Sequence, residues 1–208
     1  MNRPEPMHLF PKQLFGSLLM LLLLHCAGTP PMFYYRIDYS PPSADSLNHL
    51  LPAVIGVDRF DADVLYDQDR IVYRSSPYEV QFYNYRRWIA PPPRLVKDRV
   101  YEHLRASGLF RQVVRLPSLI PTDYVLQGRI KAFEEWDEAD RWFGQVTIVF
   151  QLYRVEDREL VWEGEFSHKT PTRQKTPVEV VRAISESLKT VIDQALHSMA
   201  RQLQHQSE

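Results

Sequence analysis

The sequence predicts an α+β fold, in which a mainly antiparallel sheet has two helices packed on one face. Three segments in the second half of the chain alternate apolar and polar residues, as strands with one buried face do. Two other segments place apolar residues three or four positions apart, as amphipathic helices do. Elements that each have one apolar side bury these sides against one another, so we expect the five segments to share one core.

The first 25 residues have the pattern of a secretory signal peptide. Arg3 and Lys12 precede an apolar run from Leu14 to Leu24, which is shorter than the roughly 20 residues that span a hydrocarbon core. Cys26, the single cysteine of the chain, follows two residues after this run. The sequence Leu-Leu-His-Cys-Ala is similar to a bacterial lipobox, in which the cysteine is acylated and becomes the mature N-terminus.

Two interpretations of Cys26 remain open. Lipidation is favoured because a secreted protein has little reason to carry one unpaired thiol, and the chain has no second cysteine for a disulfide. The alternative is ordinary cleavage after Gly28, which His25 favours because Gly, Ala or Ser usually precedes a lipobox cysteine. Lipidation predicts a periplasm-facing anchor in the outer membrane, since Ala27 rather than aspartate follows the cysteine. Ordinary cleavage predicts a soluble periplasmic protein.

The remaining chain is long enough for one domain with a sizeable core. We divide it into a signal peptide (1–25), a lipidated tether (26–31) and one domain (32–208). The precursor has 25 basic and 26 acidic residues, and cleavage of the signal peptide removes two basic residues and one acidic residue. The near balance of charge gives no support for nucleic-acid binding, which needs a clustered positive surface.

The first half of the domain is expected to hold short strands and loops. The strands are predicted where aromatic and β-branched residues gather, at 32–39, 53–57, 70–74 and 78–83. Between them, Pro41 and Pro42 predict a loop over 40–52. The five aspartates within 58–69 predict a solvated connection, and Ser75-Ser76-Pro77 predicts a turn.

The second half is expected to hold both helices and the alternating strands. The first helix begins at the prolines 91–93 and ends at Gly108, with Val96, Val100 and Leu104 on its buried side. Three strands then form an antiparallel meander, at 124–132, 146–152 and 160–166, with the even-numbered residues facing the core. Thr176, Pro177 and Glu179 predict a capping box at the start of the second helix. Its predicted core stripe is Val181, Ile184, Leu188, Val191, Ala195 and Met199.

No motif in the sequence predicts an enzyme, a cofactor or a metal site. There is no glycine-rich phosphate loop, no Gly-x-Ser-x-Gly elbow and no pair of histidines at ligand spacing on a helix. The acidic residues Glu134, Glu135, Asp137, Glu138 and Asp140 lack the pattern of a calcium loop. We therefore expect them to form a solvated hairpin tip.

One segment has the composition of an interaction surface. Tyr83, Tyr85, Arg87 and Trp88 precede the first helix, and Tyr, Trp and Arg are enriched at interaction hot spots. We predict that these four residues bind a protein partner or another copy of the chain. The alternative for Trp88 is that it packs the start of the helix onto the sheet.

Several segments, taken in order, resemble one family, the ABC-type transport auxiliary lipoproteins. They are the lipobox, Tyr34-Tyr35-Arg36-Ile37, Ile55-Gly56-Val57, Arg70-Ile71-Val72-Tyr73-Arg74, Arg87-Trp88-Ile89-Ala90-Pro91-Pro92, Tyr124-Val125-Leu126-Gln127-Gly128 and the capped C-terminal helix. Each segment is weak alone, and their order and spacing carry the resemblance over nearly the whole mature chain. The family includes the paraquat-inducible lipoprotein of mammalian-cell-entry lipid-transport systems.

The resemblance implies a non-catalytic accessory that is tethered to the outer membrane. Its expected partners are a periplasmic lipid-conducting channel or substrate-binding protein and, in a homo-oligomer, further copies of the chain. A second hypothesis is a structural or assembly lipoprotein, similar to the lipoprotein that plugs the lipopolysaccharide translocon. That protein has a comparable sheet with two helices, so the fold alone does not separate the two hypotheses.

Overall fold

The structure is a computed structural model of the 208-residue chain. It describes residues 30–41 and 51–205, and its contacts separate residues 1–31 from the unit that begins at Met32. The predicted signal peptide (1–25), Cys26 and residues 27–29 of the predicted tether lie outside the described residues. Within the described part, no helix is long and apolar enough to cross a membrane.

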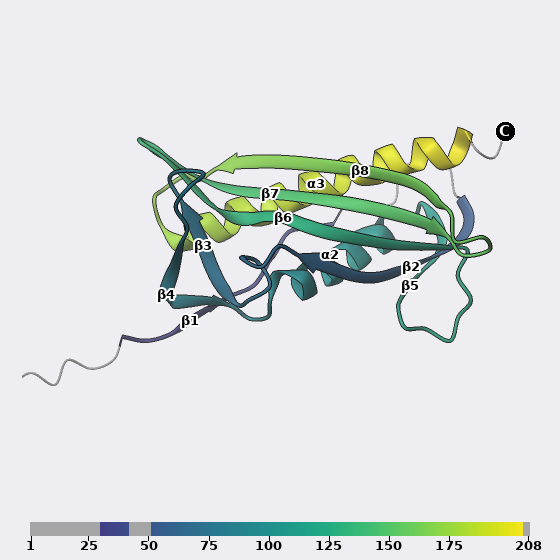
Figure 1. Cartoon of the computed structure of the whole chain (residues 1–208), viewed down its shortest axis with the longest axis horizontal. Coiled ribbons are helices and arrows are strands. Elements are labelled where there is room, and N and C mark those ends of the chain that lie inside the picture. Colours follow the sequence, from purple (N-terminus) through teal and green to yellow (C-terminus); the bar gives the residue numbers. More distant parts are fainter. Residues whose placement is uncertain (1–29, 42–50, 206–208) are drawn as a thin grey trace, which may run out of the picture. The chain divides into compact units, whose positions relative to one another are not determined.

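Eight strands and two helices make up the described part of the chain (Figure 1). They are β1 (Phe33–Tyr35), β2 (Leu51–Ala62), β3 (Arg70–Arg74), β4 (Gln81–Trp88), α2 (Pro92–Ser107), β5 (Phe110–Arg115), β6 (Tyr124–Glu138), β7 (Arg141–Arg154), β8 (Leu160–Pro171) and α3 (Pro177–His205). The strands form one sheet, and both helices lie on the same side of it in Figure 1. Helix α2 packs on β2 and β5, and α3 packs on β7 and β8. The predicted α+β class with two covering helices is therefore confirmed.

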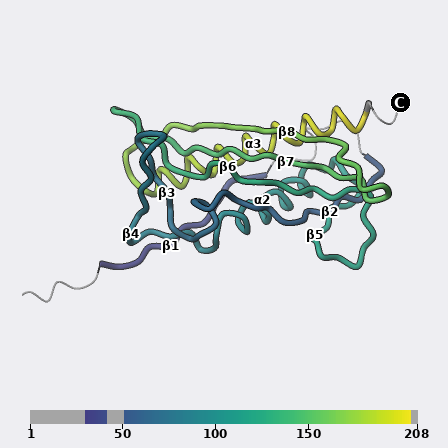
Figure 2. The backbone as a smooth tube through the Cα atoms, in the orientation of Figure 1, coloured from purple at the N-terminus to yellow at the C-terminus, as the bar shows by residue number. Residues whose placement is uncertain are grey.

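The sheet is mixed, which corrects the prediction of a mainly antiparallel sheet. Its strand order is β1–β4–β3–β6–β2–β5, with β7 paired to β6 and β8 to β7. Four pairings are parallel, namely β1–β4, β2–β5, β2–β6 and β3–β6, and three are antiparallel. The predicted meander is present as β6–β7–β8, whose strands run side by side in Figure 2. The parallel pairs were missed because they join distant segments and have no local hairpin turn as a signal.

Several predicted strand boundaries are also corrected. The strand expected at 32–39 has only the three residues of β1, because the chain turns toward α3 and the Asp38 amide donates to Ser185 Oγ over 3.2 Å. Strand β2 continues to Ala62 through residues expected to form a solvated connection. Strand β4 begins at Gln81 rather than Tyr78. Strand β5 was not predicted, since its sequence FRQVVR does not alternate.

Both helices begin and end close to the predicted residues. Pro91 is the residue before α2, and Gly108 ends this helix in a left-handed conformation with φ of 65°. The Glu179 amide donates to Thr176 Oγ1 over 3.4 Å at the start of α3. The second half of the predicted capping box is different, because the Glu179 carboxylate accepts from the amide of Arg173 (3.1 Å) rather than from Thr176.

A bulge in β6 reverses which residues face the core. Up to Ile130, the even-numbered residues of β6 pair with the even, buried residues of β7, as predicted. The register shifts between Ile130 and Ala132, so Phe133 pairs with Val146 and Glu135 with Gly144. Directly opposed residues of a strand pair point to the same face. Beyond the bulge, the odd-numbered residues of β6 therefore face the helices.

Helix α3 lies close against the sheet at Gly144 of β7. A Cβ atom on Gly144 would lie 2.2 Å from the backbone nitrogen of Ile184, which leaves space only for glycine. Ser187 Oγ donates to the Gly144 carbonyl over 2.8 Å at the same place. The predicted stripe of α3 is buried in full, with exposed fractions between 0% and 8% for Val181, Ile184, Leu188, Val191, Ala195 and Met199.

Candidate functional site

The four residues predicted to bind a partner lie on β4 but in different environments. Trp88 is 1% exposed, and its ring packs on Phe133 with centroids 5.2 Å apart. It is therefore a core residue, which is the alternative that the sequence left open. Tyr85 is exposed, and the Arg87 guanidinium is partly covered and pairs with Asp69 over 3.1 Å.

The pairing of β4 explains why strict alternation does not describe this segment. Arg87 pairs with Arg70 of β3, and Phe82 pairs with Val72, so residues 83–86 lie opposite a single residue, Ile71. Such an irregularity lets the extra residues leave the regular ladder and turn their side chains in new directions. Tyr85 remains accessible, whereas the hydroxyl of Tyr83 turns into the sheet.

Tyr83 joins the predicted cluster to the acidic segment of β6. Its hydroxyl donates to Glu135 Oε2 over 2.8 Å, and its ring lies 5.0 Å from that of Tyr73. Glu135 is 1% exposed because the bulge turns it toward the helices. The expectation that this part of β6 is a solvated tip is therefore wrong for Glu135.

Glu135 and Asp137 form a carboxyl pair, in which Glu135 is buried and Asp137 is partly exposed. Burial raises the pKa of Glu135 to about 8, and the hydrogen bond to Asp137 adds to this rise. Burial also raises the pKa of Asp137. The second oxygen of Glu135 and Oδ1 of Asp137 are buried and receive no N–H or O–H donor from the described residues. Burial and the neighbouring carboxyl therefore both favour the protonated form of Glu135.

Glu134 points to the opposite face of the sheet and is fully buried as well. Tyr66 donates its hydroxyl hydrogen to Glu134 Oε2 over 2.5 Å, and Arg74 forms an ion pair with Oε1. The Arg74 guanidinium also lies over the Trp136 ring, 5.2 Å from its centroid. Because its charge is paired and hydrogen-bonded, Glu134 holds β3 to β6, and the predicted solvated tip is wrong for this residue too.

The end of the β6–β7 hairpin is exposed, as predicted. Beside it lies a surface hollow of about 540 Å³, which is lined by Ser75, Trp136, Asp137, Glu138, Ala139, Trp142 and Lys175. Among the described residues, no group of three acidic, histidine or cysteine side chains is placed to hold a metal ion.

A surface that the sequence did not single out lies at the free edge of β1. Met32, Phe33, Tyr34 and Ile89, which we call the tether-proximal patch, are between 40% and 64% exposed. Within the described part of the chain, β1 pairs only with β4, so its other edge is open. The aromatic run at residues 33–35 was the available signal, but the sequence interpretation used it for a strand and for the family resemblance, not for an exposed surface.

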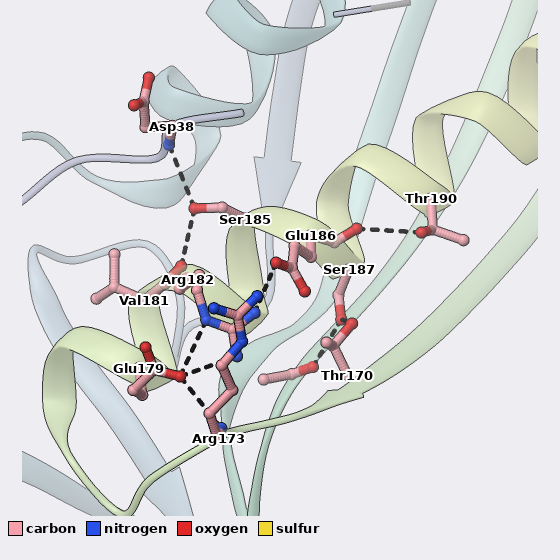
Figure 3. Close-up of polar contacts among 11 residues, drawn as sticks. Asp38, Thr170, Arg173, Glu179, Val181, Arg182, Ser185, Glu186, Ser187 and Thr190 are labelled. Carbon is pink, nitrogen blue, oxygen red and sulfur yellow. Dashed lines mark hydrogen bonds and ion pairs between the residues drawn. The ribbon is translucent and has the colours of Figure 1, made fainter. Parts of the chain in front are cut away.

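A hydrogen-bond network on α3 fixes the chain that leaves β1 (Figure 3). Ser185 Oγ accepts from the Asp38 amide and donates to the Val181 carbonyl over 2.8 Å. Arg182 pairs with Glu179 at 3.0 Å and with Glu186 at 2.6 Å in the same region. The bond between Asp38 and Ser185 connects the segment after β1 to the core helix, so the patch belongs to the folded domain.

The two helices share one buried polar link. His103 of α2 is fully buried, and its Nε2 lies 2.8 Å from Asp193 Oδ1 on α3. Its Nδ1 lies 3.4 Å from the Tyr39 hydroxyl. The sequence interpretation gave His103 no partner, because its two neighbours are far away in the chain.

The fold is shared with proteins of known structure. Protein XCC0632 from Xanthomonas campestris, of the family DUF330, matches with a TM-score of 0.74 and 19% identity, over 84% of this chain and 98% of that chain. An uncharacterized protein matches with a TM-score of 0.64 and 12% identity, over 82% and 99% of the two chains. The PelC dodecamer from Paraburkholderia phytofirmans matches more loosely, with a TM-score of 0.46, 16% identity and coverage of 76% and 92%.

The sequence itself gives the family. The sequence model of one protein family, the ABC-type transport auxiliary lipoprotein component, matches residues 35–195, which is most of the chain. The chain therefore belongs to this family, as the resemblance predicted. Among the curated proteins, no sequence matches this chain.

Proposed function

We propose that the protein is a non-catalytic accessory lipoprotein of an ABC-type lipid-transport system of the mammalian-cell-entry kind. In this proposal it is anchored in the outer membrane, faces the periplasm and docks a periplasmic component of the transporter. The observation that carries the proposal is the family match over residues 35–195. A transport auxiliary component needs an anchor and a docking surface, and the chain offers a candidate for each.

Cys26 is the candidate anchor. It follows an apolar run that is too short to span a membrane, and the family is one of lipoproteins. Two acyl chains give stable membrane binding, whereas a single chain gives only marginal binding. We expect mass spectrometry of the mature N-terminus to find an acylated Cys26. An unmodified N-terminus at Thr29 would instead mean ordinary secretion.

The candidate docking surface is the exposed part of β4 around Tyr85. Tyr85 is exposed, and Arg86 lies beside it with its guanidinium 5.3 Å from the centroid of the Tyr83 ring. Of the predicted residues, Tyr83 and Arg87 have partners within the fold, so in this proposal they shape the surface and Tyr85 makes the main contact.

The absence of catalysis is also part of the proposal. A nucleophile or a general base must reach its substrate, so it has to lie in an accessible cleft. The buried His103 pairs with the partly exposed Asp193 and so connects two helices, and the Glu135 carboxyl is covered by Tyr83 and Asp137. These positions suit a structural role for the buried ionisable groups.

The test is capture of the periplasmic transporter component by the lipidated full-length protein in detergent. We expect the component encoded beside this protein to co-purify, and lipid transfer between membranes to fail when the protein is removed. Loss of lipopolysaccharide assembly without loss of lipid transfer would instead support the assembly hypothesis. Native mass spectrometry of the same sample would count the copies of the chain in the complex.

A further inference from the structure

We propose that the tether-proximal patch lies against the lipid headgroup region of the membrane in which Cys26 is anchored. The patch would thus be a second membrane contact, made by the folded domain itself. This inference rests on the lipid anchor of the proposed function.

The length of the tether is the first argument. Only residues 27–31 separate Cys26 from Met32, the first residue of the patch. A fully extended chain spans at most about 3.6 Å per residue, so Met32 lies within roughly 22 Å of the anchored cysteine. Pro30 and Pro31 restrict the last part of the tether. The patch is therefore held close to the bilayer surface whenever the cysteine is acylated.

The chemistry of the patch is the second argument. Aromatic side chains prefer the interface between lipid and water, where the ring is buried and the polar group stays wet. The patch contains Phe33 and Tyr34 together with the apolar residues Met32, which precedes β1, and Ile89, whose amide bonds the end of β1. Two other large apolar residues that are strongly exposed, Val64 and Leu119, lie on separate loops.

Two arginines beside the patch suit a surface of phosphate groups. The Arg86 guanidinium lies over the Phe33 ring, 6.0 Å from its centroid, and the Arg36 side chain is 69% exposed. Arg36 pairs with Asp38 only at 3.8 Å and on the surface, where such pairs are weak. Both guanidinium groups can therefore bind lipid phosphates while the apolar side chains enter the headgroup layer.

The rigid connection of the patch is the third argument. β1 pairs with β4 from Phe33 to Tyr35, and the Ile89 amide donates to the Tyr35 carbonyl over 2.9 Å. A flexible tether alone would leave the domain free to rotate about its anchor. A patch that is part of the sheet would fix one orientation of the domain on the membrane.

The experiment uses the lipidated full-length protein in vesicles of phosphatidylethanolamine and phosphatidylglycerol. Cys26 is the only cysteine and its thiol is acylated, so a new cysteine can be labelled alone with an environment-sensitive NBD dye. The test variants are Tyr34→Cys and Ile89→Cys. The matched control is Leu119→Cys, because Leu119 is fully exposed on the loop between β5 and β6.

We expect the dye at positions 34 and 89 to shift to the blue and to be quenched by lipids with brominated acyl chains. At position 119 the dye should remain water-like and unquenched. A water-like signal at all three positions would overturn the proposal. So would a dye at 34 that shifts only after the transporter component is added, since that result assigns the edge to a protein partner.

Flotation of the vesicles separates this inference from the proposed function. A protein that floats with vesicles but gives a water-like signal at 34 and 89 has its anchor without the second contact. A protein that does not float has no lipid anchor, which would refute the anchoring step and the inference that rests on it. Arg36→Ser with Arg86→Ser should reduce the blue shift at 34 if phosphate binding contributes.

Discussion

At the scale of single residues, the surroundings of Glu135 favour the protonated form of its carboxyl group. It accepts from the Tyr83 hydroxyl at one oxygen, and its other oxygen faces Asp137, which has no hydrogen to donate when ionised. A second carboxylate beside Glu135 repels its charged form, so the protonated form is favoured. Burial adds to this effect because water cannot solvate the charge.

The raised pKa gives the protein a predictable dependence on pH. The pKa of Glu135 is about 8 in the folded protein and ordinarily about 4.5. Between these values the folded state binds a proton that the unfolded state does not, so the free energy of unfolding falls as pH rises. The contribution is complete below the lower pKa and is lost as pH passes through the upper one.

We expect that Glu135→Gln no longer loses stability as pH rises through the pKa of Glu135. The amide keeps an acceptor for Tyr83 and supplies a permanent donor to Asp137, whatever the pH. In denaturant melts at pH 5, the variant and the wild type should have similar free energies of unfolding. At pH 8, the free energy of unfolding of the variant should be higher by on the order of 2 kcal/mol. The control is Asp140→Asn at the exposed hairpin tip. If the free energies of unfolding of Glu135→Gln and wild type changed in parallel with pH, this would contradict the raised pKa of Glu135.

At the scale of elements, the close contact between α3 and β7 depends on Gly144, because glycine has no side chain. The space at Gly144 is filled by the backbone of Ala183 and Ile184, which cannot move without moving the helix. At Gly164, on the neighbouring strand β8, an added Cβ would meet only the ring atoms of Phe166 and Trp162. The same change should therefore have different costs at the two positions.

We predict that Gly144→Ala destabilises the domain by about 1–3 kcal/mol or more, because overpacking forces α3 away from the sheet. This corresponds to a fall in Tm of several degrees for a domain of this size, on the order of 2–4 °C per kcal/mol. Gly164→Ala is the matched control and should have the smaller effect, since a side chain can rotate. Equal melting temperatures for the two variants would mean that α3 is not held at Gly144.

A second prediction at this scale concerns the stripe of α3. Leu188 is fully buried in the middle of the stripe, whereas Gln194 is exposed on the same helix. Leu188→Asp should cost several kcal/mol, of a total stability of roughly 5–15, because it buries an unpaired carboxylate. Thermal melting should show little change for Gln194→Asp. A stable Leu188→Asp variant would refute the packing of α3 as a core helix.

At the scale of the whole molecule, the sequence predicted what local periodicity determines. The helices, their ends and the β6–β7–β8 meander follow from residues that are neighbours in the chain, such as Thr176 and Glu179 or the alternation from Val146 to Leu152. The parallel pairs of β2 with β5 and β6 depend on packing between distant segments, so no local pattern predicts them. The mixed sheet was missed for this reason.

The candidate site was predictable only in part, for a related reason. Composition pointed to Tyr83 and Tyr85, but the bulge after Ile130 decides that Glu135 faces inward and meets Tyr83. A bulge is one extra residue without a distinctive sequence, and it reverses every later side chain of the strand. The burial of Glu134 and Glu135 was therefore beyond the reach of alternation arguments.

The last prediction separates docking from folding across the whole molecule. Tyr85 is exposed and has no role in the core, so Tyr85→Ala should leave the melting temperature unchanged. If Tyr85 is a hot spot, its truncation costs at least about 2 kcal/mol, or roughly a thirtyfold rise in Kd for the transporter component. Tyr83→Phe should lower the melting temperature and leave the affinity unchanged, because it removes the hydrogen bond to Glu135 and keeps the ring.

Tyr78 provides the matched control for Tyr85, since it is 96% exposed and lies just before β4. Tyr78→Ala should change neither the melting temperature nor the capture of the component. Affinity would be measured with immobilised partner and lipidated protein, and stability by circular dichroism. Unchanged affinity for Tyr85→Ala would remove the exposed part of β4 as the docking surface, because no other predicted residue of that cluster is as accessible. A loss of affinity with Tyr83→Phe alone would place the contact at the Tyr83–Glu135 pair instead.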